Sequence, residues 1–110
     1  MREHTPWGEV QGEEVMAEGI KVVYTASHGG IVLSDEKARK LNGLKSINFL
    51  GSSKYWEEDC DWAIPFVAFA EEIEATTPKV FFEKNLSAAI RTIESQHKGV
   101  NIPKFKKEVI

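Results

Sequence analysis

The sequence predicts one α+β domain, in which a small antiparallel sheet from the N-terminal half packs against two or three helices from the C-terminal half. Residues 7–33 contain short runs of β-branched and aromatic side chains separated by glycines, which is typical of a strand meander. Residues 55–98 carry apolar side chains at helical intervals. The chain of 110 residues is long enough for one hydrophobic core and too short for two.

The first strands are predicted from short alternating runs. Residues 7–11 and 14–16 lie on either side of Gly12, as in a hairpin. Residues 31–33 return to a β-type sequence after Gly29-Gly30, and these two glycines can supply the positive φ of a tight connection.

Residues 20–25 form the central predicted strand, and Glu18-Gly19 forms the turn before it. Ile20, Val22 and Tyr24 alternate along this strand and therefore share one face. We expect Val22 and Tyr24 to be buried in the core.

Ser34 predicts the start of a two-turn helix. It is a good N-cap residue, acidic side chains follow it, and Asn42-Gly43 is a stop signal. Residues 43–54 are predicted to be a loop around a small apolar anchor.

The second half predicts helices over residues 55–73 and 85–98. Pro65 lacks an N–H, so it must lie in a first turn or kink the helix. Thr76-Thr77-Pro78 is a second start signal. The predicted core spans residues 5–98, and a basic tail follows it over residues 99–110. From this half we expect these side chains to be buried: Cys60, Trp62, Phe66, Phe69, Leu86, Ile90 and Ile93.

The charged residues are distributed in blocks. Residues 37–54 carry five basic side chains and no acidic one, whereas residues 55–74 carry seven acidic side chains and no basic one. Such blocks are usually solvated faces that pair with each other in the fold. The alternative is that one basic block binds an anionic ligand. The net charge of −3 disfavours general binding to duplex nucleic acid, which needs a net basic surface.

Composition also restricts the compartment and the cofactors. There is no run of 18 apolar residues and no secretory-type N-terminus, so we expect no membrane span. A single cysteine, Cys60, excludes an internal disulfide and favours a reducing cytoplasm. Of the four acids in residues 57–61, Glu57 and Glu58 are typical of an acidic helix N-terminus, and magnesium or calcium sites usually need ligands from a shaped loop or several elements, so no metal or other cofactor is expected.

The strongest candidate site lies around Ser27, His28, Gly29 and Gly30. A histidine beside two glycines can approach a ligand closely, because no Cβ covers the backbone N–H groups. The alternative is a hairpin corner in which His28 only caps neighbouring carbonyls.

Four further residues complete the predicted ligand-binding set. We expect Asp59 or Asp61 to lie close to His28 and to orient it. Trp7 is a candidate stacking surface, and Lys54 a candidate basic contact. Two catalytic arrangements are disfavoured. Cys60 lies beside acids, which makes it a poor nucleophile for a pair with His28, and the adjacent Ser27 and His28 rarely point at each other as a triad with an acid requires. No catalytic residue is therefore assigned.

Three sequence blocks together resemble a known family. TPWG at 5–8, TASHGG at 25–30 and YWEEDCDWA at 55–63 are similar, in order and spacing, to an uncharacterised family of small proteins encoded by phages, plasmids and other bacterial mobile elements. The resemblance covers residues 5–97 and implies the cytoplasm of a bacterial host. It implies no activity, so no functional residue is transferred from it.

Three functions remain as hypotheses in that setting. The first is a non-enzymatic binder that sequesters a small polar or nucleotide-like ligand as an anti-defence sponge. The second is an inhibitor or regulator that binds a host protein through its charged blocks. The third is a small hydrolase centred on His28. The many apolar residues and separate charge blocks also allow a homo-oligomer.

Overall fold

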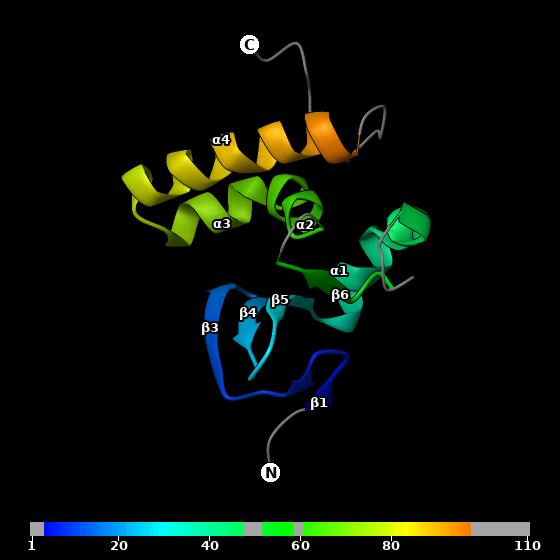
Figure 1. Ribbon diagram of the computed structural model, residues 1–110. Coiled ribbons are helices and arrows are strands. Elements are labelled where there is room, and N and C mark those ends of the chain that lie inside the picture. Colours follow the sequence, from blue (N-terminus) through cyan, green and yellow to red (C-terminus); the bar gives the residue numbers. More distant parts are fainter. Residues whose placement is uncertain (1–3, 48–51, 59–60, 98–110) are drawn as a thin grey trace.

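The computed structural model describes residues 4–47, 52–58 and 61–97 and confirms the α+β class (Figure 1). A four-stranded sheet is followed in the chain by a layer of three helices. In chain order the elements are β1 (His4–Thr5), β2 (Gly8–Glu9), β3 (Gly12–Ala17), β4 (Ile20–Tyr24), β5 (Gly29–Leu33), α1 (Asp35–Lys40), the 3-10 helix η1 (Asn42–Ile47), β6 (Tyr55–Glu57), α2 (Ala63–Ala68), α3 (Ala70–Thr76) and α4 (Lys79–Gln96).

The main sheet is antiparallel, with the strand order β3-β4-β5-β6. The turn between β3 and β4 contains Gly19, whose φ of 80° lies in the left-handed region that favours glycine. Strands β4 and β5 pair along their whole length, from Ile20 opposite Leu33 to Tyr24 opposite Gly29. Among the described strands, β3 is therefore an edge of the sheet.

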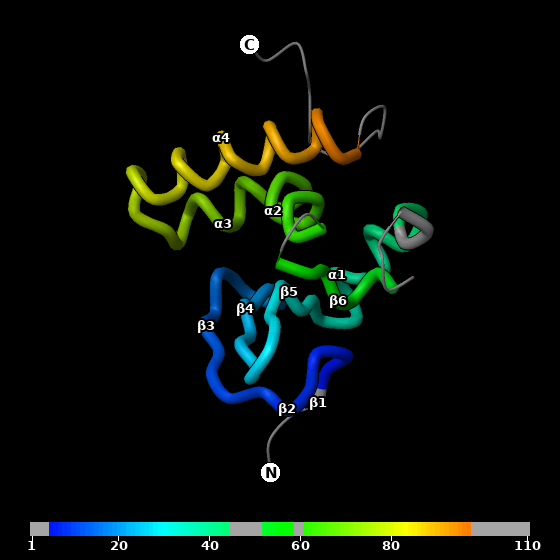
Figure 2. The backbone as a smooth tube through the Cα atoms, in the orientation of Figure 1, coloured from blue at the N-terminus to red at the C-terminus, as the bar shows by residue number. Residues whose placement is uncertain are grey.

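Each face of this sheet carries buried side chains. Ile20, Ile31 and Leu33 belong to the larger core cluster, which includes the helices. Val23 and Val32 point to the opposite face and pack in a second cluster with residues that precede the sheet. The β1–β2 hairpin lies on this second side, away from the helices (Figure 2).

The prediction that Val22 and Tyr24 are buried is therefore wrong for Tyr24 and only partly correct for Val22. Ile20 is buried, but Val22 is half-buried and Tyr24 is 49% exposed. Val23, on the opposite face, is completely buried. The helices do not pack closely over the Tyr24 end of β4, because a groove lies there between sheet and helices.

Residues 55–57 form β6 and not the start of the predicted long helix. This strand pairs with β5, with Trp56 opposite Ile31. Trp56 is fully buried, and its indole Nε1 donates a hydrogen bond to the carbonyl of Ser53 at 2.7 Å. An aromatic residue in the middle of a short strand suits this pairing, which depends on a partner far away in the sequence.

The helical layer has α4 on its outer side, over α2 and α3 (Figure 1). Pro65 lies in the first turn of α2, as one of the two sequence alternatives requires. The chain bends at Phe69, which ends α2 and precedes α3. Helix α4 begins directly after Pro78, as predicted, but six residues before the expected residue 85. Within the described ranges, none of the helices has the length and apolarity needed to cross a bilayer.

The helix layer is held together by aromatic and aliphatic packing. Phe66 stacks on Phe82 with ring centroids 5.8 Å apart. Of the side chains predicted to be buried here, Phe66, Phe69 and Ile93 are buried. Trp62, Leu86 and Ile90 are packed against the core but only half-buried. Cys60 lies outside the described residues.

Helix α1 confirms the capping prediction and connects the charge blocks. The Ser34 hydroxyl accepts a hydrogen bond from the Lys37 backbone N–H at 3.2 Å. The Lys37 ammonium contacts the Glu72 carboxylate and lies 5.1 Å from the centroid of the Phe69 ring. A basic block thus pairs with an acidic block. Residues 42–47, predicted as part of a loop, form the 3-10 helix η1.

Candidate functional site

Ser27 and His28 lie in the tight turn between β4 and β5, and both are exposed. The Thr25 hydroxyl donates to the carbonyl of His28 at 2.7 Å and accepts from the His28 backbone N–H at 3.1 Å. The Thr25 backbone N–H donates to the same carbonyl at 2.8 Å. This geometry is the hairpin corner that the sequence left open as the alternative.

Gly29 and Gly30 are not turn residues, because both are buried in β5 and neither has a positive φ. A Cβ on Gly29 would lie 2.5 Å from the carbonyl oxygen of Val23. A Cβ on Gly30 would lie 2.3 Å from the carbonyl oxygen of Trp56 and 2.7 Å from the Trp7 ring. The two glycines thus allow the neighbouring strands and the Trp7 indole to pack closely against β5. The prediction that they form a tight connection with positive φ is wrong.

Trp7 is buried in the second core cluster and does not offer a free stacking face. Its ring packs edge-on against Tyr55, with centroids 6.0 Å apart and planes at 88°. Lys54 lies elsewhere, with Nζ 3.4 Å from Asp35 Oδ1 and 6.0 Å from the centroid of the Tyr55 ring. Both residues therefore have structural contacts within the fold.

Asp61 is buried and lies close to a histidine other than His28. Its Oδ1 is 3.4 Å from Nε2 of His97, whose side chain is also buried. This distance allows an electrostatic contact, but the geometry is not that of a hydrogen bond. The pair joins the turn before α2 to the end of α4. Asp59 lies outside the described residues.

Removing the His97 side chain should destabilise the fold, because the buried Asp61 carboxylate would lose a neighbour that can carry positive charge. We expect His97→Ala to lower the free energy of unfolding by about 1–2 kcal/mol, as measured by urea denaturation. Gln96→Ala is the matched control, because Gln96 is the exposed residue beside it on the same helix end. Equal stabilities of the two variants would contradict a stabilising role of the Asp61–His97 contact.

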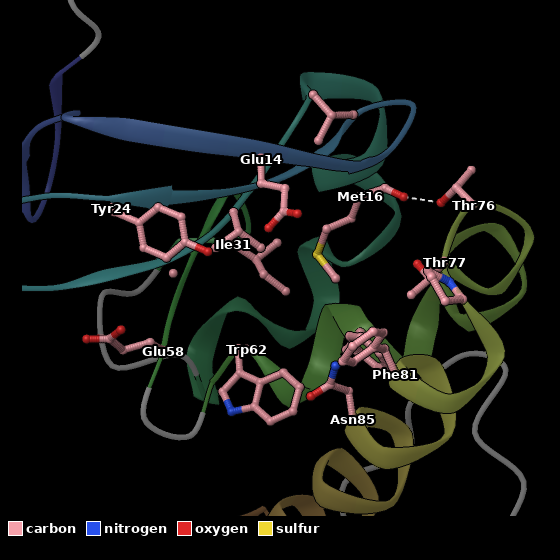
Figure 3. Close-up of a pocket in the computed structure, with 15 residues that line it drawn as sticks. Glu14, Met16, Tyr24, Ile31, Glu58, Trp62, Thr76, Thr77, Phe81 and Asn85 are labelled. Carbon is pink, nitrogen blue, oxygen red and sulfur yellow. Dashed lines mark hydrogen bonds between the residues drawn. The ribbon is translucent and has the colours of Figure 1, made fainter.

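A groove lies between the sheet and the helices, with a volume of about 660 Å³. This volume lies in the range of small-ligand sites, about 300–1,000 Å³. Figure 3 shows Glu14, Tyr24 and Met16 on the sheet side, opposite Trp62, Phe81 and Asn85 on the helix side. The lining residues are Glu14, Val15, Met16, Val22, Tyr24, Gly30, Ile31, Glu58, Trp62, Phe66, Thr76, Thr77, Pro78, Phe81 and Asn85.

Tyr24 is the most prominent side chain of the sheet wall. In the register of the sheet it lies between Gly12 on β3 and Gly29 on β5. Neither neighbour carries a side chain, so the Tyr24 ring is 49% exposed in the groove. A tyrosine in this setting presents a ring face and a hydroxyl to a ligand.

The helix wall is also aromatic. Phe81, in the first turn of α4, is 62% exposed, whereas the adjacent Phe82 is buried in the core. Trp62 is half-buried and packs edge-on against Phe66, with centroids 5.6 Å apart. The Thr76 hydroxyl donates to the carbonyl of Met16 and so joins the two walls at one end of the groove (Figure 3).

The charge of the groove is negative. Among the described residues, its lining includes two exposed carboxylates, Glu14 and Glu58, and no lysine, arginine or histidine. In the part of the chain that the structure describes, no group of three or more histidine, cysteine, aspartate or glutamate side chains is placed to hold a metal ion. The groove thus combines aromatic surface with acidic groups.

Asp59 lies outside the described residues, and of the other seven residues predicted to bind ligand only Gly30 belongs to the described lining of this groove. Sequence reasoning missed Tyr24 because its alternation with Ile20 and Val22 indicated burial. One sequence signal could have indicated the groove. Phe81 follows Pro78 closely and lies outside the apolar helix face that begins with Phe82. Core packing therefore does not explain why a phenylalanine stands at this position, and an exposed aromatic residue of this kind indicates a binding surface.

Fold and groove define this chain as a small α+β domain with an open aromatic and acidic groove. The chain belongs to the family described as Domain of unknown function (DUF7007), which it matches over residues 1–100. This membership confirms the expectation of an uncharacterised domain family. No curated protein and no solved structure matches the chain.

Proposed function

We propose that this protein acts by binding rather than by catalysis, and that its ligand or partner occupies the groove between the sheet and the helices. The observation that carries the proposal is the exposure of Tyr24 and Phe81 on opposite walls of a groove of about 660 Å³. Large apolar side chains that remain exposed around a concave surface are typical of binding sites.

The chemistry of the groove favours a protein partner over a nucleotide-like ligand. A phosphate would lie near Glu14 and Glu58, and the part of the lining that the structure describes has no basic side chain to neutralise it. In the phage or plasmid setting that the sequence resemblance implies, such a protein would block or regulate a host protein in the cytoplasm. The alternative hypothesis is sequestration of a nucleotide-like anti-defence signal, and the pair of nucleoside probes described below tests it.

The hydrolase hypothesis receives less support from the described residues. His28 is exposed in the hairpin corner, whereas the histidine that the described residues place beside a carboxylate is His97, whose side chain is buried next to Asp61. Neither histidine lines the groove. A general base needs to reach a bound substrate, and neither position provides this geometry.

The experiment is a fragment screen followed by amide chemical-shift mapping on isotopically labelled protein. We expect the shifts of bound fragments to cluster on residues of the groove, and Phe81→Ser to abolish them. Val80→Ser is the matched control, because Val80 is exposed on the same helix turn but does not line the groove. Both substitutions are at exposed sites, so each should change stability by no more than about 0.5 kcal/mol.

A pair of probes separates the two binding hypotheses. We expect adenosine to shift the groove amides more than adenosine monophosphate does, because the carboxylates repel the phosphate. Shifts that cluster on residues 25–28 and Lys54, or tighter binding of the monophosphate, would contradict the proposed groove and support the nucleotide hypothesis.

A further inference from the structure

We propose that the groove recognises an arginine side chain in an extended peptide segment of a partner protein, held against the Tyr24 ring between the carboxylates of Glu14 and Glu58. This inference rests on the proposed binding function and specifies its ligand. It depends on three features of the groove: an open aromatic ring, two acidic groups beside it, and an apolar surface next to them.

The Tyr24 ring can receive a planar cation because its neighbours on both strands are glycines. Gly12 lies so close that a Cβ there would be 3.8 Å from Cδ2 of Tyr24. Gly29 flanks the ring from the other strand. The planar guanidinium of arginine stacks on aromatic faces, and a compact ammonium does so less well.

Two carboxylates lie near this ring on the same face of the sheet. Glu58 Oε1 is 3.6 Å from the position that a Cβ on Gly29 would occupy, and the Glu58 backbone N–H donates to the carbonyl of Gly29 at 3.1 Å. Glu14 pairs with Val22 in the register, so it lies diagonally across from Tyr24. A guanidinium stacked on Tyr24 could therefore reach a carboxylate on either side.

Within the described ranges, neither Glu14 nor Glu58 forms an ion pair, whereas two other acids of the same layers do. Glu13, the neighbour of Glu14 on β3, points to the opposite face, where its Oε1 lies 3.2 Å from Nζ of Lys21. Glu72 contacts Lys37 in the same way on the helix layer. Glu14 and Glu58 are therefore open to an ion pair with a cationic side chain of a partner.

The rest of the groove suits the residues beside such an arginine. A volume of about 660 Å³ exceeds that of one side chain. Met16, Trp62 and Phe81 continue the lining with apolar surface (Figure 3). The lining also includes Glu14 to Met16 of β3, an edge among the described strands, along which an extended segment can lie. These features favour a peptide over a small cation.

The test uses arrayed nine-residue peptides with randomised apolar flanks and a fixed central residue. This residue is arginine, its uncharged analogue citrulline, or glutamate. We expect the best arginine peptides to bind labelled protein about 10-fold more tightly than their citrulline counterparts, because only arginine adds charge. Glutamate peptides should not bind, and 0.5 M salt should weaken the arginine peptides most.

Variants assign the effect to the groove. Glu14→Gln combined with Glu58→Gln should reduce arginine-peptide affinity to the level of citrulline, and Tyr24→Ala should reduce it further, whereas Tyr24→Phe should retain it. Glu13→Gln is the control, because it removes the same charge from the same strand but on the other face of the sheet. We expect this control to bind as the parent does.

The outcomes distinguish this inference from the function on which it rests. Equal binding of arginine and citrulline peptides, with shifts on groove residues, would overturn arginine recognition and leave the binding groove intact. Arginine amide binding as tightly as the peptides would overturn the peptide partner. Absence of peptide binding would overturn the inference, and the fragment screen would then decide separately whether the groove binds ligands at all.

Discussion

Replacing Trp56 with alanine is expected to lower the free energy of unfolding by about 3–5 kcal/mol, as for other large aromatic side chains removed from a core. Trp56 is fully buried at the centre of β6, opposite Ile31. Its indole also donates a hydrogen bond to Ser53, so truncation leaves a cavity and an unpaired carbonyl together. A loss of this size is a large part of the stability of a small domain, about 5–15 kcal/mol.

The matched control is Trp62→Ala, which removes the same side chain from a half-buried site in the groove. The sequence alone predicts a cost of about 3–5 kcal/mol for Trp62 and for Phe69. With the structure we keep this expectation for the buried Phe69 and lower it for Trp62. Guanidinium denaturation of the three variants tests the order, and a Trp62 variant less stable than the Trp56 variant would contradict it.

The features that sequence predicts best here depend on neighbouring residues. Ser34 caps α1, Gly19 takes a positive φ in the turn between β3 and β4, and Pro78 precedes α4. Each of these signals acts through the local backbone, either by supplying a hydrogen bond or by restricting φ. Local signals do not depend on which elements meet later, and for this reason they remain valid in the folded chain.

The failures concern residues whose environment is decided by distant parts of the chain. The spacing of apolar residues from 55 to 73 is compatible with a helix, yet residues 55–57 form a strand because β5 offers an edge for pairing. Residue patterns alone do not show this partner. The same limit applies to the sheet, where Trp7 and Val10, from a run predicted as the first strand of the meander, instead cover the second buried face.

The candidate site was missed for a related reason. A histidine beside two glycines suggests a site, because glycine often allows a ligand to approach the backbone. Here the space above Gly30 is occupied by the Trp7 ring of the chain itself. Tyr24 was assigned to the core by its alternation, but the glycines at positions 12 and 29 leave it open to the groove. The identity of cross-strand neighbours decided both cases.

The second large effect is expected at Gly30. A Cβ at this position would lie 2.3 Å from the backbone carbonyl oxygen of Trp56, closer than any normal contact, and the backbone of β6 would have to shift. The same Cβ would lie 2.7 and 2.9 Å from two atoms of the Trp7 ring. We expect Gly30→Ala to lower the free energy of unfolding by about 2–3 kcal/mol through overpacking.

Gly43→Ala is the control that separates overpacking from the general effect of replacing a glycine. A Cβ on Gly43 would meet no atom within 4 Å, and Gly43 lies in the helical segment η1. We therefore expect this variant to be as stable as the parent, or more stable by about 0.5–1 kcal/mol, because alanine restricts the unfolded chain. Urea denaturation and near-ultraviolet circular dichroism should show a less stable Gly30 variant with an altered tryptophan signal. If the two alanine variants were equally stable, Gly30 would not be required by the packing of Trp7 and β6, and the ligand-binding interpretation of the glycine pair would regain support.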